Sequence, residues 1–174
     1  DLSSEQILAK SSNIGAYKLA KLLGRHSFYN YIKDFGFTKK TGVELTAESS
    51  GTVTKPDSSI WSKSSLSRIA MGYEVDVTAL QMVAALSVIA NGGVLLKPQI
   101  IKRIQSSDGV SMHEFKPQKV RRVIHENAAN MVKNALVSVV EKGGTGTRAA
   151  LEGYVVAGKT GTAKKPRDPR NLGY

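Results

Sequence analysis

The segment Lys159-Thr160-Gly161-Thr162 carries the residue types best suited to bind a substrate carboxylate. A lysine ammonium supplies positive potential, and two threonine hydroxyls can donate hydrogen bonds to a carboxylate or carbonyl oxygen. Gly161 has no Cβ, so a substrate backbone can lie close to the chain there. Taken alone, these residues are also typical of an ordinary strand end at the surface.

A second group, Ser11-Ser12-Asn13, lies at the junction of two predicted helical segments. A hydroxyl and an amide two residues apart at such a junction can point into one cleft. Serine and asparagine are also the preferred N-cap residues of helices, so helix capping is the simpler interpretation of this group alone.

Residues 153–160 also match the phosphate-binding pattern G-x-x-x-x-G-K-[ST]. That mechanism needs a flexible loop between the glycines and a helix after the threonine. Here the spacer Tyr154-Val155-Val156-Ala157 favours a buried strand, and Pro166 follows too soon for a clean helix start. We therefore expect no phosphate-binding loop.

The elements that must position these groups are mostly helices, and the sequence predicts the α+β class. The first helix starts at Ser3 or Ser4, and a capping box of Thr78 with Gln81 starts a helix that is apolar nearly all round, which predicts a buried core helix. Further helices are expected over residues 14–23, 28–35 and 126–141, strands over 120–124 and 154–157, an extended arm from 94 that turns at 107–109, and a long ordered loop over 39–67.

Composition narrows the function classes further. The chain of 174 residues has no cysteine and three widely spaced histidines, so we expect no disulfide, no metal site and no cofactor. The net charge is +11, and residues 97–174 hold 15 basic and 6 acidic side chains. A basic half of this kind is first interpreted as a solvated surface, and attraction to an anionic substrate or surface is the alternative. No apolar run approaches the ~20 residues of a membrane span. The chain does not begin with Met, so we expect an excised piece.

Together and in this order, the two motifs resemble the S-x-N and K-T-G motifs of penicillin-recognising serine enzymes. The surrounding sequence resembles class B penicillin-binding proteins, over about residues 7–165. The segments that carry this resemblance are Ile7–Gly15, Phe35–Phe37, Lys40–Gly42, Glu48–Gly51, Trp61, Gly72–Val75, Val77–Gln81, Ala90–Gly93, Lys97-Pro98, Gly143–Thr147 and Ala157–Ala163.

The resemblance implies a penicillin-binding transpeptidase or serine β-lactamase-like fold, with helices packed on an antiparallel sheet. It implies a D,D-transpeptidase that attacks the D-Ala–D-Ala amide of a peptidoglycan stem peptide through a serine acyl-enzyme, and β-lactams as ligands. The implied catalytic residues are Ser11, Asn13 and Lys159; the implied substrate-binding residues are Ser12, Thr160, Gly161 and Thr162.

The sequence departs from the family in one respect, because it contains no S-x-x-K, the motif of the family's nucleophile. We therefore expect residues 1–174 to be a single partial transpeptidase domain, truncated at both ends and inactive alone. The resemblance also implies a place on the extracytoplasmic face of a bacterial inner membrane, an anchor outside this chain and a membrane glycosyltransferase partner.

Two other classes stay open at this point. One is a catalytically inactive module of the same fold that only binds a stem peptide or a cell-wall partner. The other is a basic nucleic-acid-binding domain, which the spacing of Phe28, Tyr31 and Phe35 disfavours, because it is typical of a helix core rather than of exposed stacking residues.

Overall fold

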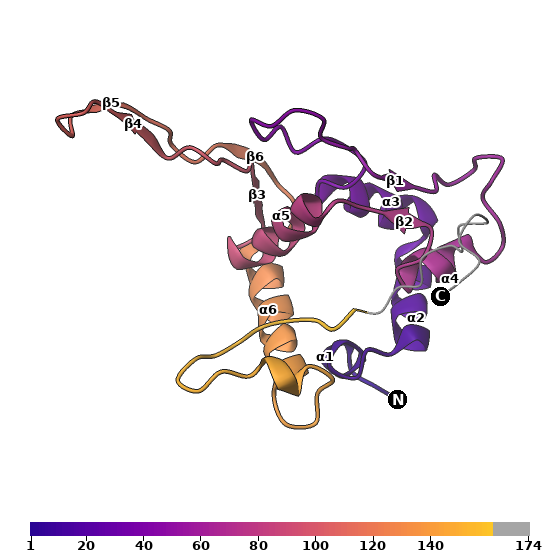
Figure 1. Cartoon of the computed structure of the whole chain (residues 1–174). Helices are drawn as coiled ribbons and strands as arrows, with labels where there is room; N and C mark the ends of the chain where they lie inside the picture. Colours follow the sequence, from indigo (N-terminus) through magenta and orange to yellow (C-terminus); the bar gives the residue numbers. More distant parts are fainter. Residues whose placement is uncertain (162–174) are drawn as a thin grey trace, which may run out of the picture.

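The computed structural model describes residues 1–161 and shows a set of helices with short antiparallel strand pairs (Figure 1). The helices are α1 (Ser4–Ala9), α2 (Asn13–Leu23), α3 (Arg25–Asp34), α4 (Ser65–Ala70), α5 (Ala79–Ala90) and α6 (Glu126–Val140), with a 3₁₀ turn, η1, at Thr147–Ala149. The strands are β1 (Thr52–Val53), β2 (Val75–Asp76), β3 (Val94–Leu96), β4 (Arg103–Gln105), β5 (Ser111–Glu114) and β6 (Lys119–Arg122).

The strands form three separate antiparallel pairs, β1 with β2, β3 with β6 and β4 with β5. Arg103 pairs with Glu114, and the chain turns between them where Ser106 N–H binds Val110 O at 3.0 Å. This β4–β5 hairpin extends away from the helices (Figure 1). The predicted α+β class and the predicted turn at 107–109 are both confirmed.

The core lies where α5 packs against α6 and β3. After the C-terminal end of α5, Gly93 allows the chain to approach Ile124 closely, since a Cβ on Gly93 would overlap the carbonyl oxygen of Ile124. The φ of Gly93, +90°, also favours glycine. The fully or nearly fully buried apolar side chains of this region are Ala85, Val88, Leu95, Ala129, Ala135, Leu136, Val139 and Val140.

Local sequence signals set several helix boundaries, although the helix predicted over 28–35 begins earlier, at Arg25. Ser3 caps α1 in a capping box with Gln6, and Thr78 caps α5 in the same way with Gln81. Gly24, at φ +82°, ends α2 and directly precedes α3. Helix α1 is short, because the turn at Ser11 and Ser12 separates it from α2.

One prediction about the core is wrong, and another is confirmed only in part. Residues 154–157 form no strand, and Val155 is 85% exposed; a strand needs a hydrogen-bonded neighbour, and residues 1–161 place none beside it. Helix α5 belongs to the core, as predicted, but it is not buried on every side, since Val83 is 60% exposed. The apolar pattern of α5 indicates which side chains could be buried, but other described residues cover only part of the helix surface.

The long segment 39–67 is mainly loop, as expected, but it also contains β1 and the first residues of α4. The side chain of Gln81 holds it, with Nε2 donating to Lys39 O and to Ser50 O at 2.8 Å each. Within residues 1–161, no helix is both long and apolar enough to cross a membrane.

Candidate active site

The junction between α1 and α2 presents Ser11 to solvent. Its backbone has a φ of +51°, an uncommon conformation for a residue with a side chain. The N–H groups of Ser11 and Ser12 bind Leu8 O at 3.1 Å and Ile7 O at 2.9 Å, which fixes this turn. The junction is tight, because a Cβ on the buried Gly15 would overlap the side chain of Ile7. Ser11 is therefore held in a defined, exposed position.

Ser12 and Asn13 take different parts in the same junction. Ser12 is the N-cap of α2, and its Oγ accepts a hydrogen bond from Gly15 N–H at 3.1 Å. Asn13 is the first residue of α2, and its side chain is exposed. Of the three side chains, the Ser12 hydroxyl therefore caps the helix, and those of Ser11 and Asn13 do not.

The segment that contains Lys159 is fixed to the rest of the chain from both sides. Gly158 N–H donates to Leu136 O of α6 at 3.1 Å. The hydroxyls of Thr160 and Thr145 lie 3.0 Å apart, and Thr145 N–H in turn donates to Ala9 O of α1 at 3.3 Å. The loop around Thr145 therefore links the 159–161 segment to the helix that precedes Ser11.

These contacts bring the two motifs together across 148 positions of sequence. Lys159 Nζ donates to Ser11 Oγ at 2.7 Å, and also to the carbonyl oxygen of Thr160 at 2.9 Å. A third contact, of 3.4 Å, joins Nζ to Thr160 Oγ1. Partial burial lowers the pKa of Lys159, because removal of water disfavours the charged ammonium. An ammonium that already binds a serine hydroxyl and gives up its proton more readily than usual suits a proton relay.

A cleft of about 520 Å³ opens at this contact. Residues 69–73, at the end of α4 and after it, form its other wall. The lining residues are Ile7, Leu8, Ser11, Ser12, Asn13, Ala16, Ile69, Ala70, Met71, Gly72, Tyr73, Lys159, Thr160 and Gly161. The volume is in the range of small-ligand sites, about 300–1,000 Å³.

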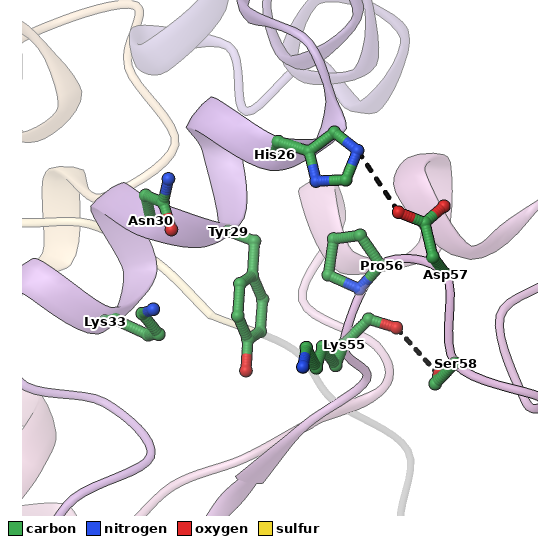
Figure 2. Close-up of a pocket in the computed structure, with 8 residues that line it drawn as sticks. All are labelled: His26, Tyr29, Asn30, Lys33, Lys55, Pro56, Asp57 and Ser58. Atoms are coloured by element: carbon green, nitrogen blue, oxygen red, sulfur yellow. Dashed lines mark hydrogen bonds and ion pairs between the residues drawn. The ribbon is translucent and has the colours of Figure 1, made fainter.

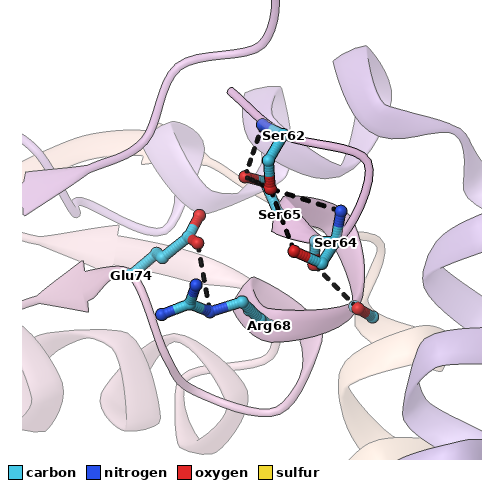
Figure 3. A network of polar contacts seen from close by, with 6 residues as sticks. Ser62, Ser64, Ser65, Arg68 and Glu74 are labelled. Atoms are coloured by element: carbon cyan, nitrogen blue, oxygen red, sulfur yellow. Dashed lines mark hydrogen bonds and ion pairs between the residues drawn. The ribbon is translucent and has the colours of Figure 1, made fainter. Parts of the chain in front are cut away.

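A polar network supports the 69–73 wall (Figure 3). Ser65, the first residue of α4, is fully buried, and its Oγ accepts a hydrogen bond from Ser62 N–H at 3.0 Å. Arg68 Nε lies 3.1 Å from Glu74 Oε1, so the ion pair spans the wall from one end to the other. Glu74 has a φ of +57° and its other carboxylate oxygen, Oε2, is buried with no partner in residues 1–161.

Five of the seven predicted site residues line one cleft and cap no helix: Ser11, Asn13, Lys159, Thr160 and Gly161. Ser12 lines the same cleft while capping α2. Thr162 lies outside the described residues.

Sequence reasoning did not identify Thr145 or residues 69–73 as parts of the site. Gly72-Tyr73 and Gly143–Thr147 are among the segments that resemble class B penicillin-binding proteins, and this resemblance is the sequence feature that indicates their importance. Within residues 1–161, no three His, Cys, Asp or Glu side chains group as metal ligands.

The chain as a whole matches a known protein family. Residues 1–172 match the family described as penicillin binding protein transpeptidase domain. The chain is 39% identical to penicillin-binding protein PbpB of Mycolicibacterium smegmatis, over 91% of this chain and 25% of that protein. It is 38% identical to stage V sporulation protein D of Bacillus subtilis, over 96% and 26%. It is 32% identical to peptidoglycan D,D-transpeptidase FtsI of Escherichia coli, over 95% and 26%.

Solved structures agree with the sequence matches. Penicillin-binding protein 3 of Mycobacterium tuberculosis, complexed with aztreonam, superimposes with a TM-score of 0.84 at 36% identity, over 94% of this chain and 37% of that one. The transpeptidase domain of penicillin-binding protein 3 from Burkholderia pseudomallei gives 0.81 at 28% identity, over 97% and 47%. The chain spans about a quarter of the length of the curated relatives it matches.

Proposed function

Since the chain belongs to the penicillin-binding protein transpeptidase family, we propose that it supplies the S-x-N and K-T-G portion of a class B peptidoglycan D,D-transpeptidase domain. The observation that carries the proposal is the 2.7 Å hydrogen bond from Lys159 Nζ to Ser11 Oγ, inside a cleft large enough for a peptide end. Relatives that are named peptidoglycan D,D-transpeptidases support the same class of reaction, transpeptidation by acyl transfer.

In the proposed reaction, a serine of an S-x-x-K motif attacks the D-Ala–D-Ala amide of a stem peptide and forms an acyl-enzyme, releasing D-alanine. The amine of a second stem peptide then attacks the ester and restores the serine. Ser11 carries the proton between the nucleophile's lysine and the leaving amine, and Lys159 holds and tunes the Ser11 hydroxyl. β-Lactams enter the same cleft as mimics of the dipeptide.

Substrate binding in this proposal uses the remaining side chains of the cleft. The Asn13 amide holds a backbone amide of the stem peptide, while the Lys159 ammonium and the Thr160 hydroxyl hold its terminal carboxylate. Gly161 lets the peptide backbone approach the 159–161 segment. Thr162 binds the same carboxylate, and its N–H donates to the oxyanion.

The 174 residues contain no S-x-x-K, so the chain alone neither acylates nor cross-links in this proposal. The motif comes from a longer gene product, anchored so that the domain lies on the extracytoplasmic face of a bacterial inner membrane. There it works beside a membrane glycosyltransferase that supplies the glycan strands.

The test combines the gene and a mass measurement. We expect an in-frame S-x-x-K upstream of Asp1, and one covalent penicillin adduct on the longer product but none on residues 1–174. An upstream region without that serine and lysine would contradict the transpeptidase proposal and favour a binding module. A stoichiometric adduct on residues 1–174 would contradict the assignment of the nucleophile to another segment.

A further inference from the structure

A second groove, separate from the active-site cleft, lies between α3 and the segment 55–58 (Figure 2). Its volume is about 440 Å³, and none of its lining residues lines the active-site cleft. Tyr29 and Lys33 of α3 form one wall, and Lys55 and Pro56 form the other. The Pro56 ring is buried and the Tyr29 ring is half-buried, so the two rings give the groove apolar walls.

Contacts of Asp57 and Ser58 connect the two walls of the groove. Asp57, at a φ of +64°, places its carboxylate against the first turn of α3, 2.9 Å from Arg25 and 3.2 Å from His26. Ser58 Oγ donates to Lys55 O at 2.7 Å and closes the turn. A preformed groove loses less conformational entropy on binding than one that must be ordered by its ligand.

The charges on the groove are unbalanced. Asp57 is its only acidic lining residue and is already paired with Arg25 and His26. Lys33 and Lys55 also line the groove, and neither has an ion-pair partner within residues 1–161. Lys33 Nζ lies 5.4 Å from the centre of the Tyr29 ring, so one ammonium stands directly beside an apolar surface. The groove therefore presents positive charge next to aromatic and proline rings.

We propose that this groove binds an acidic peptide segment of a partner protein, with a glutamate or aspartate next to an apolar residue. Lys33 and Lys55 pair with the carboxylates, while the apolar side chain packs between Tyr29 and Pro56. A free phosphate would leave the rings unused. A flat lipid surface would not enter a groove whose walls rise on both sides. Charge complementarity with apolar anchoring thus favours a peptide, and it goes beyond the proposed transpeptidase function.

Fluorescence anisotropy with a labelled peptide that alternates glutamate with leucine and proline tests the proposal, and its matched control replaces each glutamate by glutamine. We expect the acidic peptide to bind the chain at least tenfold more tightly than the control, with an affinity that falls as salt rises. The double variant Lys33→Glu with Lys55→Glu should lose this binding. Lys18→Glu with Lys21→Glu, on exposed positions of α2, carries the same change of net charge and should retain it.

A measurement on the unmodified chain keeps the proposal falsifiable if the groove variant does not fold. Backbone ¹H–¹⁵N spectra of the unmodified chain should shift on peptide addition at residues 25–34 and 55–58, and not at residues 69–73. Equal binding of both peptides, shifts elsewhere, or equal loss in the two double variants would overturn it. Binding to anionic phospholipid vesicles that depends on Lys33 and Lys55, without binding of the acidic peptide, would also overturn it and assign the groove to a lipid surface.

Discussion

Gln81 offers the sharpest test of how the structure is held together, because it is 1% exposed and both polar atoms of its side chain form hydrogen bonds. Its Oε1 accepts from Thr78 N–H at 2.9 Å, and its Nε2 donates to Lys39 O and Ser50 O. One side chain therefore starts α5 and fixes two points of the long 39–67 loop.

The substitution Gln81→Leu keeps the approximate size of the side chain and removes all three of these hydrogen bonds. The three hydrogen bonds are partly buried, and the backbone groups left behind belong to Thr78 and to the exposed residues Lys39 and Ser50. At roughly 1 kcal/mol for each lost hydrogen bond, the free energy of unfolding should fall by about 3 kcal/mol. Gln81→Glu should cost more at neutral pH, because it aims a carboxylate at two carbonyl oxygens.

Urea unfolding, followed by far-UV circular dichroism and Trp61 fluorescence, measures both changes. Burial raises the pKa of the carboxyl introduced by Gln81→Glu, so the folded variant binds a proton more tightly and should regain stability as pH falls. Gln105→Leu is the control, since Gln105 is exposed and makes one 3.5 Å contact. A Gln81→Leu variant as stable as the Gln105→Leu variant would refute the reasoning.

Two further predictions concern local packing and charge. Gly93→Ala should lower the midpoint of thermal unfolding, because the added Cβ overlaps Ile124 O at a backbone conformation that favours glycine; an unchanged midpoint would contradict the close approach. Hydrogen bonds from Thr41 and Gly42 lower the pKa of Glu48 below its usual value of 4.5. Wild type should therefore be more stable than Glu48→Gln near pH 7, and this difference should vanish as pH falls below that lowered pKa; a constant difference in urea titrations would speak against it.

Local signals allowed most helix boundaries to be predicted. The capping boxes at Ser3 and Thr78 and the glycine at 24 act within a few residues, so the sequence carries them directly. Residues 154–157 failed as a predicted strand because a strand depends on a neighbour, which is not encoded in the segment itself. The same holds for α5, whose apolar pattern says nothing about which faces the described chain covers.

The site was predicted in part for a similar reason. Ser11 and Lys159 are recognisable by motif, but their contact depends on Thr145 and on the packing of α1 against α6. Residues 69–73 form a cleft wall without a nucleophile or an ion-pairing side chain, so their residue types alone did not predict a place in the site. The ion pair of Arg68 with Glu74 that flanks these residues was likewise not indicated by any motif in the sequence.

The most direct test of the proposed function is the second-order rate constant for acylation by penicillin of the longer gene product that carries S-x-x-K. Lys159→Met removes the ammonium that binds Ser11, and a hydrogen bond to a charged group is worth about 1.5–3 kcal/mol. We expect a loss of roughly 10- to 100-fold in rate, while Lys18→Met, at an exposed position of α2, leaves the rate unchanged. A Lys159→Met protein that is acylated as fast as the Lys18→Met protein would contradict the account.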